Sequence, residues 1–239
     1  MVDRPEDAKL SSSMLSTLEA LSESTPVAIV SGRDLEDVES MVRSDRFWFS
    51  GSHGFDVRTP QCERIQMELG ATALPALDRA AEELRMEIED IEGAWLERKQ
   101  FAIAVHYRAT PEHLVDDLQL LVRAEADRHD QLRMTGGKKI FELRPAADWD
   151  KGRAILWLMD VMGLDPGEVV PVFIGDDVTD EDGFVALRDL GIGIVVAEPG
   201  GSTDDALADE PRTSAALDRL ADPDAVGGFL DRVARNNEK

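Results

Sequence analysis

The chain has 239 residues, a length that fits one large domain or a core with one insertion. Apolar residues make up 43% of it and charged residues 31%, a balance typical of globular proteins that argues against a disordered or fibrous chain. The 49 acidic residues exceed the 26 basic ones, and the formal net charge of −23 argues against a nucleic-acid binder or a protein that binds acidic membranes.

Two further features indicate where the protein acts. The longest apolar runs, near 169–174 and 190–197, are far shorter than the roughly 20 residues of a membrane-spanning helix. Cys62 is the single cysteine, so no internal disulfide can form, and residues 1–10 contain no apolar stretch of the kind found in secretion signals. We therefore expect a cytoplasmic protein.

The first segment, residues 1–57, alternates between helical and strand patterns. Apolar residues recur at helical spacing until Thr25 and Pro26, where the proline ends the element. The apolar run that follows indicates a buried strand, and Asp34 suits the N-cap of the next helix, whose first turn is acidic. The expected elements are a helix within 5–23, a strand at 27–30, a helix from Asp34 to about 42, and a strand with its turn at 47–54.

The second segment, residues 58–143, has a different pattern. Its helices are long and amphipathic, and one of its strands alternates apolar and polar residues as a half-exposed strand does. An antiparallel sheet with two helices on one face accounts for this order. The expected elements are helices at 71–92 and 111–127 and strands near 94–98, 101–107, 131–135 and 139–143.

The third segment, residues 144–239, returns to the alternation of the first. Alternating strands and helices predict a parallel sheet. The sequence therefore predicts an α/β protein with a Rossmann-like parallel-sheet core, interrupted by an inserted α+β domain. The expected elements are a helix at 150–162, a strand at 169–175, a helix from about 179, a strand at 192–197 and closing helices.

The densest acidic cluster, GDDVTDED, follows the apolar strand expected at 169–175 and contains Asp176, Asp177 and Asp180. Carboxylates at the carboxyl end of a parallel strand occupy the usual place for a site, and hard oxygen ligands suit Mg²⁺. Acidic residues also stabilise a helix N-terminus, so a solvated turn explains the same residues. The cluster alone does not separate these two interpretations.

A second candidate site lies where the strand expected at 27–30 ends. Ser31, Gly32 and Arg33 offer a hydroxyl and backbone N–H groups at a helix N-terminus, an arrangement that can hold a phosphate. An ordinary strand-to-helix turn explains the pattern as well. Lys151 stands at the start of another expected helix, where a cation opposes the helix dipole, and this placement favours a functional reason.

Polar residues of the second segment follow strand periodicity. A mixed set of acids and bases on one sheet face suits sugar hydroxyls and a phosphate, although simple exposure of that face explains the alternation too. The alternating polar residues of the second segment are Glu97, Lys99, His106, Arg108, Lys138 and Glu142.

His53 lies in the turn after the strand expected near 47–50. It fits either a ligand contact or a capped loop.

The ordered motifs carry a family resemblance over nearly the whole chain. Taken together they resemble the trehalose-6-phosphate phosphatase family of haloacid dehalogenase-like hydrolases, in which the insertion is a cap over the sugar. The resemblance implies a Mg²⁺-dependent phosphatase that acts on trehalose 6-phosphate in trehalose biosynthesis. The motifs are VAIVSGR, GSHG, HYR, GKKIFELRP, DKG and GDDVTDEDGF.

The same resemblance assigns roles to residues of this chain. It implies that Ser31 hydrogen-bonds the transferring phosphoryl group, that Lys151 neutralises its charge and that Asp176 binds Mg²⁺. Asp177 and Asp180 would support the metal site. His53, Lys99, Lys138 and Glu142 match family positions that hold the disaccharide. We also expect Gly32, Arg33 and Arg108 to contact the substrate.

One family motif, a strand ending in Asp-x-Asp-Gly-Thr, is not found in the sequence. Its first aspartate is the nucleophile, and Asp3 is no substitute because no apolar strand precedes it. We expect such a strand upstream of Met1, placed between the strands expected at 27–30 and 170–174. Without it the chain should be nearly inert, since losing a nucleophile costs about 10⁶ in rate elsewhere.

Two alternatives to this phosphatase remain at the level of sequence. One is a phosphatase for another sugar phosphate, because the core motifs define phosphoryl transfer while the inserted domain selects the sugar. The other is a catalytically silent sugar-phosphate binder that regulates a trehalose-phosphate synthase as its partner. The motifs alone do not decide among them.

Overall fold

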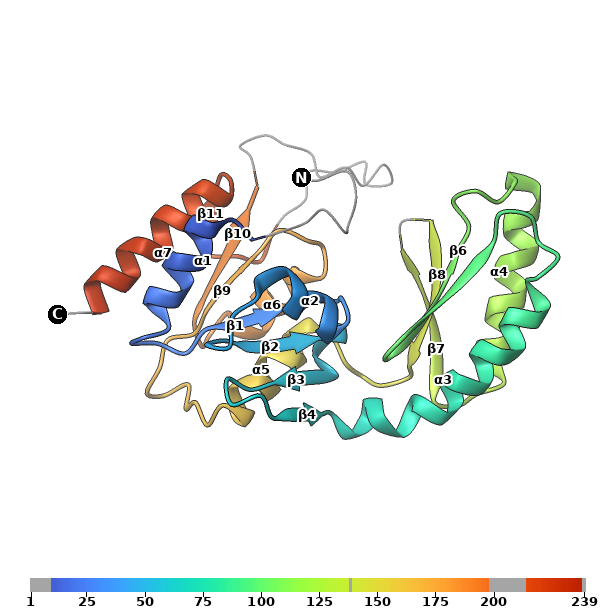
Figure 1. Ribbon diagram of the computed structural model, residues 1–239, viewed down its shortest axis with the longest axis horizontal. Coiled ribbons are helices and arrows are strands. Elements are labelled where there is room, and N and C mark those ends of the chain that lie inside the picture. Colours follow the sequence, from blue (N-terminus) through green and yellow to red (C-terminus); the bar gives the residue numbers. More distant parts are fainter. Residues whose placement is uncertain (1–9, 138, 198–213, 238–239) are drawn as a thin grey trace.

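The computed structural model describes residues 10–137, 139–197 and 214–237 (Figure 1). Figure 1 shows two lobes, which we call the core lobe and the cap lobe; the cap lobe comprises residues 68–145. The mixed α/β class predicted from the sequence is confirmed by the parallel strand pairs of the core lobe. Within the described residues, no helix is both long and apolar enough to cross a membrane.

The first sheet of the core lobe has the strand order β1-β2-β3-β4. Its first pair is parallel and the next two pairs are antiparallel. The last strand lies beyond residue 57, where we placed the end of the first core segment, so this sheet continues farther along the chain. Its strands are β1 (Ala28–Val30), β2 (Trp48–Gly51), β3 (Asp56–Arg58) and β4 (Arg64–Gln66).

The second sheet of the core lobe is entirely parallel, in the order β11-β10-β9. Two of its strands coincide with the predicted apolar runs, whereas β11, with the residues Asp-Arg-Leu, has no apolar pattern that would reveal it. The strands are β9 (Val172–Gly175), β10 (Ile192–Val196) and β11 (Asp218–Leu220).

Helices pack around these two sheets. Phe47 and Phe49, both fully buried, form the centre of a cluster that joins the first sheet to α1, α2 and α7. On the other side α5 packs against α6 and against the turn that follows β2. The helices are α1 (Ser12–Leu21), α2 (Leu35–Val42), α5 (Lys151–Val161), α6 (Asp180–Leu187) and α7 (Pro223–Asn237).

The cap lobe is an antiparallel sheet of order β5-β6-β8-β7 with two helices on one face. This is the arrangement that the alternating pattern of the second segment predicts. Figure 1 shows the helices on the outer side of the sheet. The elements are α3 (Glu68–Glu87), β5 (Trp95–Lys99), β6 (Ala102–His106), α4 (Glu112–Asp127), β7 (Leu132–Gly137) and β8 (Ile140–Pro145).

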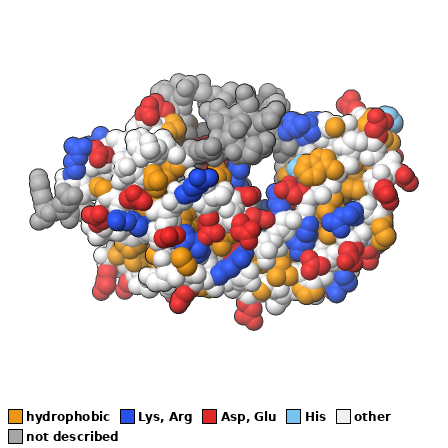
Figure 2. All heavy atoms as spheres, in the orientation of Figure 1, with side chains coloured by type: hydrophobic (Ala, Val, Ile, Leu, Met, Phe, Trp, Pro, Cys, Tyr) orange, Lys and Arg blue, Asp and Glu red, His pale blue; other side chains and the backbone are white. Residues whose placement is uncertain are grey.

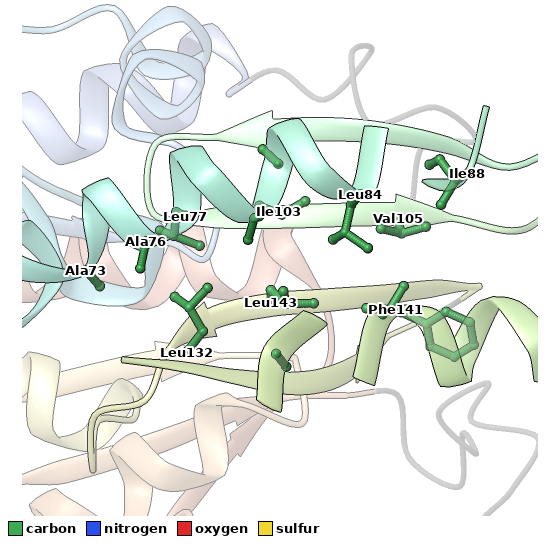
Figure 3. Packing of buried hydrophobic residues seen from close by; sticks show 14 of the residues in the cluster. Ala73, Ala76, Leu77, Leu84, Ile88, Ile103, Val105, Leu132, Phe141 and Leu143 are labelled. Carbon is green, nitrogen blue, oxygen red and sulfur yellow. The ribbon is translucent and has the colours of Figure 1, made fainter. Parts of the chain in front are cut away.

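The strand period of two divides the cap sheet into an apolar and a polar face. Figure 3 shows Leu84 of α3 and Ile103, Val105 and Leu143 of the sheet within one buried cluster between helices and strands. Because successive side chains of a strand point to opposite faces, the intervening positions lie on the other face. That face looks toward the core lobe (Figure 1).

The two core sheets are not joined by strand pairing within the described residues. β1 pairs only with β2, and β9 only with β10. The register turns the N–H groups of Ala28 and Val30 away from β2, and those of Val172 and Ile174 away from β10. Val172 is 45% exposed, although it is apolar. These strands are the ones between which the family resemblance places a further strand.

We predict that these four amides exchange hydrogen for deuterium much faster than the amides of β6, which pairs on both edges. An amide without a strand partner exchanges without any opening of the sheet. Residue-resolved hydrogen exchange by NMR measures this directly, with Val105 as the reference. Equal protection of Val30 and Val105 would contradict the prediction and indicate that the edge of β1 is covered.

Candidate functional site

The candidate site lies between the lobes, where β1 ends and the polar face of the cap sheet approaches the core. Residues of both lobes surround a small cavity of about 10 Å³. Over the molecular surface, acidic side chains lie on both lobes with Lys and Arg among them (Figure 2). The cavity is lined by Gly32, Asp34, Ser52, His53, Phe55, Lys99, Phe101, Ala102, Glu142 and Arg144.

Four residues predicted as substrate contacts meet in this cavity. Gly32 and His53 come from the core lobe, and Lys99 and Glu142 come from the cap lobe. Lys99 Nζ lies 3.3 Å from Glu142 Oε1, and Arg144 Nε lies 3.7 Å from Glu142 Oε2. The order β5-β6-β8 brings these side chains together on the polar face. The cap therefore presents an acid between two bases to the core.

The turn that follows β1 has a tightly determined geometry. Ser31 Oγ accepts a hydrogen bond of 3.1 Å from the Arg33 N–H, and the His53 N–H donates to the Ser31 carbonyl over 3.0 Å. The His53 backbone has a φ of 56°, in the left-handed region, which turns its ring toward Gly32. A Cβ at Gly32 would lie 2.5 Å from His53 Cε1, so only glycine fits beside this ring.

His53 is kept neutral by its surroundings. Burial, followed by the positive charges of Arg144, Lys151 and Lys99, lowers the pKa of its imidazole from 6.5 to about 3. Three cations thus surround one neutral ring. Each of these cations also has a carboxylate partner, which is Glu142 for Lys99 and Arg144 and Asp180 for Lys151.

We predict that His53 makes the protein less stable as the pH falls. The unfolded chain binds a proton on this imidazole below about pH 6.5, whereas the folded protein does so only near pH 3. The free energy of unfolding should therefore drop by about 2 kcal/mol more between pH 7 and pH 5 in the parent than in His53→Gln. Urea denaturation at both pH values measures the difference, and identical pH dependence would contradict the lowered pKa.

A buried ion pair lies at the start of α5. Lys151 Nζ is 2.5 Å from Asp180 Oδ1, and both residues are buried. The second oxygen, Asp180 Oδ2, accepts hydrogen bonds of 2.9 Å and 2.8 Å from the N–H groups of Asp176 and Asp177. Asp180 thereby holds Lys151 and the acidic loop in one arrangement.

The three predicted metal-site carboxylates do not form one ligand group. The described residues contain no set of three His, Cys, Asp or Glu side chains placed to hold a metal ion. The physical reason is that Asp180 is turned toward Lys151, while Asp176 and Asp177 are exposed. Desolvation, and then the charges of Asp180 and Asp177, raise the pKa of the Asp176 carboxyl. A cation beside Asp176 would relieve this repulsion.

We predict that Lys151→Met lowers the free energy of unfolding by about 3–5 kcal/mol, because it leaves the buried Asp180 carboxylate without its cation. Arg153→Met is a matched control on the same helix, since Arg153 is exposed and pairs with the exposed Asp148. The control should change stability by less than about 0.5 kcal/mol. Equal losses of unfolding free energy in the two variants, measured by urea denaturation, would show that the buried pair stabilises the protein no more than the exposed pair.

Two predicted contacts fall outside this arrangement. Arg108 is exposed beyond the end of β6, at the opposite end of the hairpin from Lys99, and does not line the cavity. Lys138 lies outside the described residues. On the polar face near Arg108, His106 Nε2 lies 2.9 Å from Glu97 Oε2 and its ring stacks on Trp95 with centroids 3.7 Å apart.

Some residues of the cavity were not predicted. Arg144 stands two positions after Glu142, so strand periodicity could have placed it on the same face. Asp34 was interpreted as a helix cap, but its side chain makes no capping bond to α2. Its carboxylate instead accepts hydrogen bonds from Ser52 Oγ and the Gln100 N–H. No sequence pattern reveals partners that lie so far along the chain.

The core sheets with their parallel strand pairs, the inserted α+β lobe and the site between them are those of a haloacid dehalogenase-like fold. A family model described as Trehalose-phosphatase matches residues 1–210, and the chain belongs to this family. The trehalose-phosphate phosphatase of Mycobacterium tuberculosis (strain ATCC 25618 / H37Rv) is 40% identical to it over 238 residues. The match covers 98% of this chain and 58% of that protein, so the chain spans about three fifths of this relative's length.

Solved structures support the same fold. A crystal structure of a trehalose-6-phosphate phosphatase related protein aligns with a TM-score of 0.77 at 24% identity and covers 100% of this chain and 93% of that chain. The trehalose-6-phosphate phosphatase of Aspergillus fumigatus, crystal form 3, aligns with a TM-score of 0.67 at 23% identity, covering 99% and 88%. At these identities the likeness extends to the fold alone.

Proposed function

We propose that this chain is a phosphatase domain that hydrolyses trehalose 6-phosphate to trehalose and inorganic phosphate with Mg²⁺, in the cytoplasm. The observation that carries the proposal is the group of cations, Arg144, Lys151 and Lys99, around His53 at the junction of the lobes. A phosphate ester is an anion, which a protein of charge −23 would otherwise repel. Family membership supports the identity of the sugar.

In this proposal the core lobe handles the phosphoryl group. The Ser31 hydroxyl and the Gly32 N–H at the end of β1 hydrogen-bond its oxygens, and Arg33 completes the turn. Lys151 neutralises the charge that develops during phosphoryl transfer. Asp180 acts as a positioning residue, because its hydrogen bonds keep Lys151 and the loop at Asp176 in place.

The acidic loop is the place for Mg²⁺. Asp176 and Asp177 offer carboxylate oxygens at the carboxyl end of β9. Desolvation, and then the charges of Asp180 and Asp177, raise the pKa of Asp176, and a cation would offset this charge. When bound, Mg²⁺ would withdraw electron density from phosphoryl oxygens. Asp180 supports this site through the backbone rather than as a direct ligand.

The cap lobe would hold the sugar. Lys99 and Glu142 face the cavity and can hydrogen-bond hydroxyl groups as donor and acceptor. His53 presents a neutral ring to the same cavity from the core lobe. Arg108 and Lys138 remain proposed contacts for a part of the substrate outside the described cavity.

We predict that the chain, preceded by a strand ending in Asp-x-Asp-Gly-Thr, releases phosphate from trehalose 6-phosphate faster than from glucose 6-phosphate or mannose 6-phosphate. Asp176→Asn should abolish Mg²⁺-dependent release, whereas Asp189→Asn, which changes an exposed acid beyond α6, should not. Phosphate release at saturating substrate measures both effects. Preference for a monosaccharide phosphate would reject trehalose 6-phosphate as the substrate.

A second candidate is a catalytically silent binder of the sugar phosphate that partners a trehalose-phosphate synthase. It is favoured by one observation, namely that the turn at Ser31 and the cations around His53 could bind a phosphate whether or not a nucleophile acts on it. Calorimetry with trehalose 6-phosphate and Mg²⁺ tests it on the chain as given. Binding without any phosphate release from the extended chain would favour this candidate over the phosphatase.

A further inference from the structure

The carboxylate of Asp34 connects the two lobes. Asp34 Oδ2 accepts a hydrogen bond of 2.9 Å from the Gln100 N–H, at the tip of the cap hairpin between β5 and β6. Its other oxygen, Oδ1, accepts one of 2.8 Å from Ser52 Oγ in the core lobe. The side chain is thus anchored on the core and reaches the cap.

Asp34 makes this connection in place of its expected local role. It occupies the N-cap position of α2 with extended backbone angles, φ −60° and ψ 148°, where an aspartate normally accepts from an N–H of its own helix. No such bond forms. The carboxylate takes a partner in the other lobe instead, and a charged acceptor makes a stronger hydrogen bond than a neutral one.

This contact lies on the rim of the cavity, at a hairpin turn that also contains Phe101. The Phe101 ring is buried and stacks on the Phe55 ring of the core lobe with centroids 5.6 Å apart. Asp34 and Gln100 add a charged hydrogen bond between the same turn and the start of a core helix.

The size of the cavity shows why such a contact matters. It encloses only about 10 Å³, far below the range of roughly 300–1,000 Å³ of pockets that hold small-molecule ligands. A sugar phosphate of two rings therefore needs the lobes to separate before it can enter. Separation must break the bond between Asp34 and the Gln100 N–H.

We infer that Asp34 is a latch residue that holds the cap lobe closed on the core lobe. Ser52 keeps the carboxylate aimed at the hairpin, and the Gln100 N–H completes the contact when the lobes close. Asp34 is a positioning residue, since it acts on the placement of the cap hairpin that carries Lys99. The inference goes beyond the proposed function, because it concerns the two arrangements of the lobes whatever sugar phosphate is bound.

The lone cysteine allows a direct test in the full chain. Cys62 is exposed in the turn between β3 and β4 of the core lobe. Asp117→Cys places a second thiol on the exposed side of α4 in the cap lobe. Spin labels on the two thiols report the distribution of distances between the lobes by pulsed electron resonance. The readout requires neither turnover nor a bound ligand.

We expect a narrow distribution in the parent and a second, displaced population in Asp34→Ala. Losing a charged hydrogen bond should raise the ratio of open to closed molecules about tenfold or more. Asp34→Asn should fall between them, because its amide oxygen still accepts from the Gln100 N–H without the charge. Asp37→Ala removes an exposed acid from the same helix and should match the parent.

Hydrogen exchange at Gln100 gives a second readout, because a general loss of stability would lower protection throughout the protein and not at the Gln100 amide alone. Its amide should lose protection in Asp34→Ala, while the amide of Val105 inside the cap stays protected. An unchanged distance distribution in Asp34→Ala, or equal opening in Asp37→Ala, would overturn the inference. If the alanine variant does not fold, Asp34→Asn decides, and parent-like behaviour in both readouts would overturn the inference too. Neither result would bear on the phosphatase activity, which phosphate release tests separately.

Discussion

The buried pair of Lys151 and Asp180 is the constraint on which the site depends. A lysine ammonium and a carboxylate are both costly to remove from water, and their mutual contact at 2.5 Å offsets that cost only while the geometry holds. Asp180 also accepts the N–H groups of Asp176 and Asp177, so its carboxylate has bonding partners on both oxygens. The start of α5, the start of α6 and the end of β9 therefore share one charged junction.

This junction also organises charge in an acidic protein. Lys151 acts on both sides of the site, lowering the pKa of His53 and opposing the rise in the pKa of Asp176. The core thus places the Lys151 ammonium within electrostatic reach of both His53 and the acidic loop. The cap adds Lys99 and Arg144 on the His53 side, where both pair with Glu142.

The two faces of the cap sheet have different contacts. One face of its sheet is apolar and packs against α3 and α4, and the other is polar and looks toward the core. The polar face is not uniform in role, however. Lys99 and Glu142 reach the cavity, whereas Glu97 and His106 pair with each other farther along the same strands. Distance along the strand, rather than the face, separates these two sets.

The sequence by itself determined the parts whose cause is local. Apolar runs and helical spacing predicted most strands and helices, because burial of one face sets these periods. The turn at Ser31 and Gly32, the acidic loop and Lys151 were also predicted, since strand ends and helix starts are visible in the residues. β11 was not predicted, because three residues without an apolar pattern carry no such signal.

Only the tertiary structure decided which of these residues meet. Asp34 was predicted to cap its own helix, yet its partners, Ser52 and Gln100, lie 18 and 66 residues farther along the chain. Asp180 was predicted to support a metal site, and nothing in the sequence indicated that its carboxylate binds Lys151, 29 residues away. A side-chain oxygen bonds to the nearest well-oriented donor in space, and its identity depends on how the lobes and strands pack. The contacts of the site therefore depend on how the strands pair and the lobes pack, which the spacing of residues along the chain does not reveal.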